Sequence, residues 1–291
     1  MTVQGELALG ELPRRLFTAT PTRLTTWLDC PRRYRFTYLD RPPPPKGPPW
    51  AHNSLGASVH LALAGFWRLE PVRRTASAAG HLLEKAWLRD GFRDVAQAGE
   101  WRARGRAMVE RYAERLDPRD EPLGVERTVA TRTSVLALSG RLDRLDDRFT
   151  VDGRRELVVV DYKTGRRVPS VFDVRSSLAL ALYALATART FRRPCVTVEL
   201  HHVPTGEVVA HQHTQESIQR HLDRAESLAL EAGAADTAYR GGLTGDGLAA
   251  TFPAQPSPSC RWCDFLRACP EGSARFAPAQ PWEALAEPQA G

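Results

Sequence analysis

Hydrophobic positions near the N-terminus follow a helical spacing. The positions that carry it are Leu24, Trp27, Leu28, Tyr34 and Tyr38. The spacing predicts a helix that is interrupted near Pro31, with Thr20 or Thr22 as the residue that caps its first turn. The proline-rich stretch Arg41–Pro49 then ends the helical pattern, because proline lacks the backbone donor that a helix needs.

Further along the chain the period of the pattern changes twice. Helical spacing covers residues 55–69, 81–116, 171–189 and 215–232. Near-alternation or continuous apolar character predicts strands over 125–138 and 156–162, joined by a turn over 146–155, and a hairpin formed by 195–203 and 207–213. The buried apolar run Leu157–Asp161 among helices predicts an α/β fold with a mixed central sheet flanked by helices.

Composition adds only broad limits. The chain has 291 residues, of which 42% are hydrophobic and 25% charged, which is typical of a globular protein. No apolar run reaches the roughly 20 residues of a membrane span, and the N-terminal sequence lacks the apolar stretch of a signal peptide, so a cytoplasmic location is expected. The net charge of +6 is compatible with a polyanionic partner and equally with a basic surface that keeps the protein soluble.

A carboxylate pair and a lysine form the most informative cluster. The strand that ends in VVVDYKTG delivers Asp161 and Lys163 to one face by period two, and Asp143 is expected near the end of the preceding strand. Two such carboxylates can hold a magnesium-like ion, and the lysine can orient water, which suits hydrolysis of a phosphodiester. The alternative is a solvated ion pair at a strand end. Lys163 favours the first interpretation, because only three of the 40 basic residues are lysines.

His60 and Glu126 are weaker candidates. His60 follows Gly56 by one helical turn and could add a nitrogen ligand to the carboxylates, although a histidine on an apolar helix is often structural. Glu126 could be a further acidic ligand or could lie beside a phosphate, but a glutamate that faces solvent from a strand is the favoured interpretation.

Four of the five cysteines predict a metal site. Cys260, Cys263 and Cys269 fall within ten residues in a polar tail, and Cys30 lies far upstream. Four thiolates can bind zinc or an iron-sulfur cluster, and binding would join the two ends of the chain. Cys195, which opens an apolar strand, is interpreted as a buried thiol of the core.

The sequence resembles the RecB-like branch of the PD-(D/E)XK nucleases, in particular exonucleases related to the CRISPR-associated Fe-S nucleases and to the AddB-type nuclease domain. The resemblance runs from about residue 20 to 270. The motifs that carry it, in family order, are TRLTTWLDCPRRYRF, LGASVH, GRLDRLD, VVDYKTG, ALYALA and CRWCDFLRAC. It implies a restriction-endonuclease-like fold.

The resemblance also implies a site and its cofactors. Its active site would consist of His60, Asp143, Asp161 and Lys163 with Mg²⁺ or Mn²⁺, and the carbonyl after Asp161 would be an extra ligand. Its cysteine pattern favours a [4Fe-4S] cluster on Cys30, Cys260, Cys263 and Cys269, with structural Zn²⁺ as the alternative. One departure is Ala179, which stands where the family has a glutamine four residues before Tyr183.

The function expected from the resemblance is that of a metal-dependent exonuclease acting on DNA ends, single-stranded DNA above all, in DNA repair or CRISPR-type processing. Contacts to DNA are expected from Arg32, Arg33, Arg35 and Tyr183. The alternative is a non-catalytic Fe-S scaffold that binds DNA within a helicase-nuclease complex; an Fe-S redox protein fits poorly. A helicase or a CRISPR-adaptation protein is the expected protein partner.

Four regions are expected along the chain. They are an N-terminal helical segment with one cluster cysteine (1–50), a helical region with the metal-ligand histidine (51–124), the nuclease core (125–235), and a cysteine-bearing segment with a loose tail (236–291). The first and last regions are expected to form an Fe-S clamp.

Overall fold

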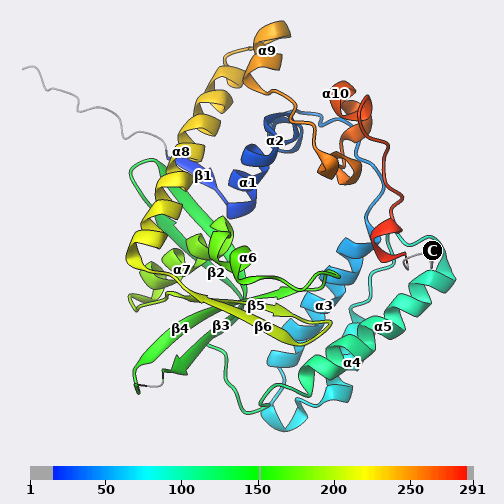
Figure 1. The fold of residues 1–291 in the computed structure, drawn as a ribbon, viewed down its shortest axis with the longest axis vertical. Helices are drawn as coiled ribbons and strands as arrows, with labels where there is room; N and C mark the ends of the chain where they lie inside the picture. The colour runs from blue at the N-terminus through cyan, green and yellow to red at the C-terminus, as the bar shows by residue number, and fades with distance from the viewer. Residues whose placement is uncertain (1–15, 151, 287–291) are drawn as a thin grey trace, which may run out of the picture.

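The computed structural model describes residues 16–150 and 152–286, which form a six-stranded mixed sheet with helices on both faces (Figure 1). The strands are β1 (Phe17–Ala19), β2 (Gly124–Arg132), β3 (Leu136–Phe149), β4 (Arg155–Lys163), β5 (Thr197–His202) and β6 (Glu207–Gln212). The helices are α1 (Pro21–Asp29), α2 (Pro31–Tyr38), α3 (Ala51–Trp67), α4 (Ala76–Lys85), α5 (Val95–Ala113), α6 (Val171–Ser176), α7 (Leu178–Phe191), α8 (Gln215–Arg240), α9 (Gly245–Thr251) and α10 (Pro270–Ser273). Short 3₁₀ turns are η1 (Pro71–Arg73), η2 (Pro258–Trp262), η3 (Leu266–Ala268) and η4 (Glu283–Leu285).

The sheet is built around β3. Its order is β1-β3-β4-β5-β6, and β2 pairs with β3 as well. Strands β2 and β4 run antiparallel to β3, whereas β4 and β5 are parallel and are joined by a crossover through α6 and α7. The predicted mixed α/β sheet is therefore confirmed.

Alternation along β4 separates the two faces of the sheet. Val158, Val160 and Tyr162 pack with α3 and α5, while Leu157 and Val159 pack with α7. All five side chains are buried, as expected for a central strand with helices on both faces. The apolar strand is thus fixed in register, and the polar residues at its end are delivered to one place.

The strand expected over 125–138 is wrong in its bounds. Thr133 accepts hydrogen bonds at its side chain from the N–H groups of Val135 and Leu136, and this turn divides the segment into β2 and β3. Strand β3 then continues through the polar sequence that was expected to be a turn, because Arg144 and Asp146 form a buried ion pair at 2.8 Å. Asp143 therefore lies within a strand and not at its end.

Two long helical patterns are also divided. Residues 81–116 contain the end of α4 and the whole of α5 with a loop between them, and Gly91 in that loop has φ +82°. A Cβ at Gly91 would lie 2.4 Å from the backbone nitrogen of Ala51, so the close approach to α3 requires glycine. The pattern over 171–189 breaks at Ser177, which caps α7 through its side chain.

The helix pair at the N-terminus is confirmed, and Thr20 is the cap of α1. The C-terminal segment lies beside this region, as Figure 1 shows for α2 and α10. Arg32 pairs with Glu271, and Trp50 donates its indole N–H to Asp264 at 2.7 Å. Residues 1–15 and the end of the expected loose tail, 287–291, lie outside the described residues. No helix in the described ranges is long and apolar enough to cross a membrane.

Candidate active site

His60 and Asp143 meet between α3 and the sheet. The imidazole Nδ1 lies 3.1 Å from Asp143 Oδ1. One helical turn before His60, a Cβ at Gly56 would lie 3.2 Å from Thr164 Oγ1, which is tighter than an ordinary contact. The glycine therefore allows α3 to approach the end of β4 closely enough for the histidine to reach the carboxylate.

Asp161 and Lys163 form the second half of the site, at the end of β4. Lys163 Nζ lies 2.6 Å from Asp161 Oδ2, as the period-two placement predicted. The backbone N–H of Tyr162, between these two residues, donates a hydrogen bond to Asp143 Oδ2 at 2.8 Å. The structure thus brings all four expected active-site residues together.

The charges of the site act on one another. Burial opposes protonation of the His60 imidazole, but the hydrogen bond and charge of Asp143 outweigh burial and raise the pKa of His60 above its ordinary value. Burial also raises the pKa of Asp161, against the opposing charge of Lys163. The charge of Asp143 raises the pKa of Asp161 further, so the two carboxylates destabilise one another in a partly buried setting, and a bound cation would stabilise both.

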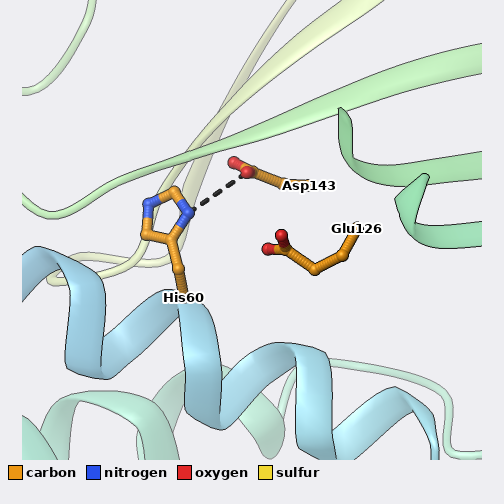
Figure 2. Close-up of side chains that lie close together, drawn as sticks. All are labelled: His60, Glu126 and Asp143. Carbon is orange, nitrogen blue, oxygen red and sulfur yellow. Dashed lines mark hydrogen bonds and ion pairs between the residues drawn. The ribbon is translucent and has the colours of Figure 1, made fainter. Parts of the chain in front are cut away.

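Glu126 belongs to this site, and the expectation that it faces solvent is wrong. It stands opposite Asp143 in the β2–β3 register, between the pairs Val125–Arg144 and Arg127–Leu142. Figure 2 shows Glu126, Asp143 and His60 converging from β2, β3 and α3. Only 18% of its side chain is exposed, and Arg141 Nε lies 2.7 Å from its Oε2.

The backbone of Glu126 is unusual as well. Its φ is +52°, a left-handed conformation that costs a non-glycine residue roughly 1–3 kcal/mol and concentrates at functional sites. The local sequence gives no signal for this conformation, because the placement of Glu126 depends on the pairing of β2 with β3. The only available signal was an acidic residue in a strand that precedes the Asp143 motif.

These residues fit a divalent metal ion. The ligand atoms of His60, Glu126 and Asp143 all lie within 4.8 Å of one another. Asp161 Oδ2 is buried, and apart from the Lys163 ammonium no donor among the described residues contacts it. Carboxylate oxygens with one imidazole are ligands suited to Mg²⁺ or Mn²⁺.

A cleft gives access to the site. It has a volume of about 930 Å³ and is lined by His60, Glu126 and Asp143 together with Arg68, Arg141 and Arg166. A smaller cavity of about 290 Å³ is lined by Asp161, Lys163 and Ala179, among other residues. The family glutamine that Ala179 replaces would therefore project into the cavity beside the lysine.

Tyr183 lies next to the site, on α7. Its ring packs on Gly140 of β3 so closely that a Cβ there would be 2.3 Å from Tyr183 Cε1. Burial raises the pKa of the Tyr183 hydroxyl, and the charges of Asp161 and Asp143 raise it further. Glycine in the GRLDRLD motif thus makes room for a tyrosine beside both carboxylates.

The three arginines expected to contact DNA lie elsewhere, on α2. Arg32 pairs with Glu271, and Arg35 lies 3.3 Å from Asp40. Arg32 and Arg33 line the cavity that holds the cysteines. None of the three lines the cleft at His60, so their contact with DNA stays a prediction.

All four predicted ligand cysteines line one cavity of about 200 Å³ between α2 and the C-terminal segment. Their thiols are free, and within residues 16–150 and 152–286 no three of them gather as closely as His60, Glu126 and Asp143 do. The chain segments expected to meet at the cysteines therefore do meet, whereas the described structure does not show a closed metal site there. Cys195 is buried in the core, as predicted.

Two solved structures were found to be similar to the chain. One is a provisionally named exonuclease from Eubacterium rectale, with 9% identity over 84% of this chain and 89% of that chain at a TM-score of 0.47. The other is the protein SSO0001, with 12% identity over 89% and 88% at a TM-score of 0.38. No curated protein matches the sequence.

The assignment rests on the family match. The profile of the PD-(D/E)XK nuclease superfamily matches residues 18–270, a range that includes all four expected active-site residues. The chain belongs to the PD-(D/E)XK nuclease superfamily.

Proposed function

We propose that the protein is a Mg²⁺- or Mn²⁺-dependent deoxyribonuclease that hydrolyses phosphodiester bonds at the ends of single-stranded DNA. The observation that carries the proposal is the junction of the His60–Asp143 pair with the Asp161–Lys163 pair through the Tyr162 N–H. Asp143, Asp161, His60 and the Tyr162 carbonyl would hold the ion. Bound there, the ion would polarise the phosphate and lower the pKa of a bound water.

The protein side chains have distinct parts in this reaction. Asp143 is held by His60 on one oxygen and by the Tyr162 N–H on the other, so both of its oxygens keep a defined direction. Lys163 is 48% exposed at its side chain and can reach a water molecule beside Asp161. An ammonium in that place orients the attacking water and stabilises negative charge that develops on the phosphate.

Two features of the cleft support a single-stranded substrate. Its volume of about 930 Å³ suits a short stretch of a single strand, and its arginines Arg68, Arg141 and Arg166 suit phosphate groups. We retain Tyr183, Arg32, Arg33 and Arg35 as proposed DNA contacts. Of these, Tyr183 has the strongest support, since it lies beside the catalytic carboxylates.

A [4Fe-4S] cluster on Cys30, Cys260, Cys263 and Cys269 completes the proposal. Backbone N–H groups of Arg33 and Ser257 point at the sulfurs of Cys30 and Cys260, at 3.5 and 3.4 Å. Tetrahedral zinc with 2.3 Å bonds would bring the sulfurs to about 3.8 Å from one another. A cubane cluster holds them farther apart, which suits thiols spread around one cavity. Reduced thiols and a cluster fit a cytoplasmic location.

Two assays test the proposal. An end-labelled linear single strand, an end-labelled linear duplex and an internally labelled circular single strand are incubated with Mg²⁺ or Mn²⁺, with Asp161→Asn as the inactive control. Degradation of the linear single strand alone is expected. Cleavage of the circle would exclude dependence on ends, and no cleavage at all would favour a DNA-binding scaffold.

Anaerobic purification with iron and zinc analysis tests the cluster. Stoichiometric zinc without iron would exclude the iron-sulfur cluster while leaving the nuclease proposal intact.

A further inference from the structure

Arg141 and Glu126 form an ion pair on the wall of the active-site cleft. Arg141 lies two residues before Asp143 on β3, and Glu126 stands opposite Asp143 on β2. The pair joins Arg141 Nε to Glu126 Oε2 at 2.7 Å. The side chain of Arg141 is 70% exposed, whereas that of Glu126 is mostly buried. The Arg141 cation therefore faces the cleft while a buried carboxylate holds it in place.

The geometry of the ion pair leaves the outer part of the guanidinium available. Its one contact to a described carboxylate uses Nε, so the two terminal nitrogens are free to donate to another group. A guanidinium can place two parallel N–H groups on two oxygens of a phosphate. Glu126 sets the direction of the Arg141 guanidinium, because the Glu126 carboxylate lies within 4.8 Å of the ligand atoms of His60 and Asp143.

The charges of the site need such a cation. The carboxylates are those of Glu126, Asp143 and Asp161, and the fixed cations are Lys163 and Arg141. With one divalent ion, and with His60 neutral as a ligand of that ion, these groups carry a single positive charge, and one phosphodiester balances it. Without Arg141 the same groups and the phosphodiester would together carry one negative charge in a partly buried site.

We propose that Arg141 is a catalytic residue that binds the non-bridging oxygens of the scissile phosphodiester, and that Glu126 is the positioning residue that directs it. This inference rests on the proposed nuclease function. Arg68 and Arg166 also line the cleft, but neither is tied to a residue of the metal site, and Arg166 is bonded to the carbonyl of Ala286. The competing assignment makes Glu126 a direct metal ligand and Arg141 a bystander.

A double-mutant cycle separates the two assignments. Single-turnover cleavage of a labelled single strand is measured for Arg141→Ala, Glu126→Gln and the double variant, with Arg127→Ala as the matched control. Arg127 is a neighbouring strand arginine that packs on Phe191 outside the cleft. Loss of one donor to a developing charge costs about 100-fold in rate, which is the result expected for Arg141→Ala. Glu126→Gln should reduce the cleavage rate by a smaller factor. In the Arg141→Ala background it should cause no further reduction.

Metal and nucleotide binding provide readouts besides activity. Calorimetry should show Mn²⁺ affinity within about twofold of the wild type for Arg141→Ala, and weaker binding of thymidine 5′-monophosphate in the presence of Ca²⁺. Arg141→Lys should restore part of the nucleotide binding, because lysine provides the positive charge but not the two parallel N–H donors of a guanidinium. Unchanged rate and nucleotide binding in Arg141→Ala would overturn the inference, as would a Glu126→Gln defect that persists in full without Arg141.

The inference and the proposed function can fail separately. If Asp161→Asn is inactive and Arg141→Ala is fully active, the nuclease stands and the role of Arg141 is excluded. If the wild type cleaves no DNA, the nuclease proposal fails. Loss of thymidine monophosphate binding in Arg141→Ala would then still support the phosphate contact, and retained binding would exclude it. Circular dichroism checks folding, which the exposed position of Arg141 should leave intact.

Discussion

Asp143 accepts a hydrogen bond from the backbone N–H of Tyr162, with 2.8 Å between Oδ2 and N. Strands β3 and β4 form a backbone ladder only as far as the pair Arg144–Val160. Beyond that pair, the carboxylate of Asp143 accepts the hydrogen bond that a backbone carbonyl of β3 would otherwise accept. The N–H belongs to the peptide that follows Asp161. The distance between the two catalytic carboxylates is therefore set by the sheet and not by side-chain rotamers alone, and this arrangement preorganises the metal site.

Asp161→Asn and Lys163→Ala test the chemistry of the β4 end. Each should reduce metal-dependent DNA cleavage by at least about 100-fold, because one removes an anionic ligand and the other the cation beside the water. Both variants should fold, since Lys163 is half exposed and asparagine preserves the shape of Asp161. Full activity in either variant would contradict its assigned role.

Metal binding should stabilise the wild type and not Asp161→Asn. An ion that binds only the folded state stabilises it by about 2.7 kcal/mol at a concentration of 100 times its Kd. Thermal unfolding with and without Mn²⁺ measures the effect, and the melting temperature of Asp161→Asn should stay constant. An equal shift in both proteins would place the ion elsewhere.

His60→Ala should weaken the site without abolishing it. The imidazole is one ligand among several, and it also holds Asp143 Oδ1. Loss of a ligand-orienting group typically costs 10–100-fold in metal affinity, so about tenfold weaker Mn²⁺ binding and partial rescue of activity at high Mn²⁺ are expected. An unchanged titration curve would assign His60 a structural role only.

Gly140→Ala tests the packing of Tyr183 on the strand beside the site. The new methyl would overlap Tyr183 Cε1, so the ring must move, and overpacking of this kind costs roughly 1–3 kcal/mol. Urea unfolding should show the loss, and Tyr183→Ala in the same protein should relieve most of it. Additive losses in the double variant would show that the two residues are not coupled.

Local pattern was sufficient for much of the fold. The apolar run before Asp161, the proline between α1 and α2, and the helix that carries His60 each follow from spacing within a few residues. The interior of β3 could not be predicted that way, because the buried Arg144–Asp146 pair continues through Arg148 to Glu199 of β5. A polar strand of this kind depends on partners that lie far away along the chain.

The residues of the site also fall into those that local motifs predict and those that contacts between strands position. His60, Asp143, Asp161 and Lys163 were predicted because they belong to short motifs. Glu126 was not, because its position beside Asp143 depends on the register between two strands and on a left-handed backbone conformation. The contact of Arg141 with Glu126 is diagonal across the same pair of strands, and no spacing along the chain indicates it.

Cys195 provides a prediction about pH that is independent of the active site. Burial raises the pKa of its thiol to about 12, from the ordinary value of 9.0. The native thiol should therefore resist alkylation by iodoacetamide at pH 8, whereas urea-unfolded protein should react. Rapid labelling of native Cys195, identified by mass spectrometry, would contradict the buried placement.

The same shift links Cys195 to stability. Its folded-state pKa is raised, so the native protein retains a proton that the unfolded chain releases; the contribution is complete below pH 9 and is lost between about pH 9 and 12. In that window the loss should approach about 1.4 kcal/mol per pH unit.

Cys195→Ala lacks the titrating thiol, so it should be less stable than the wild type near pH 7, by about 1 kcal/mol for a small buried truncation. The difference should shrink and then reverse as the pH rises above 9. Urea unfolding of both proteins at pH 7.5, 9.5 and 10.5 measures this, and a constant difference across the series would show that the thiol does not titrate as its burial requires.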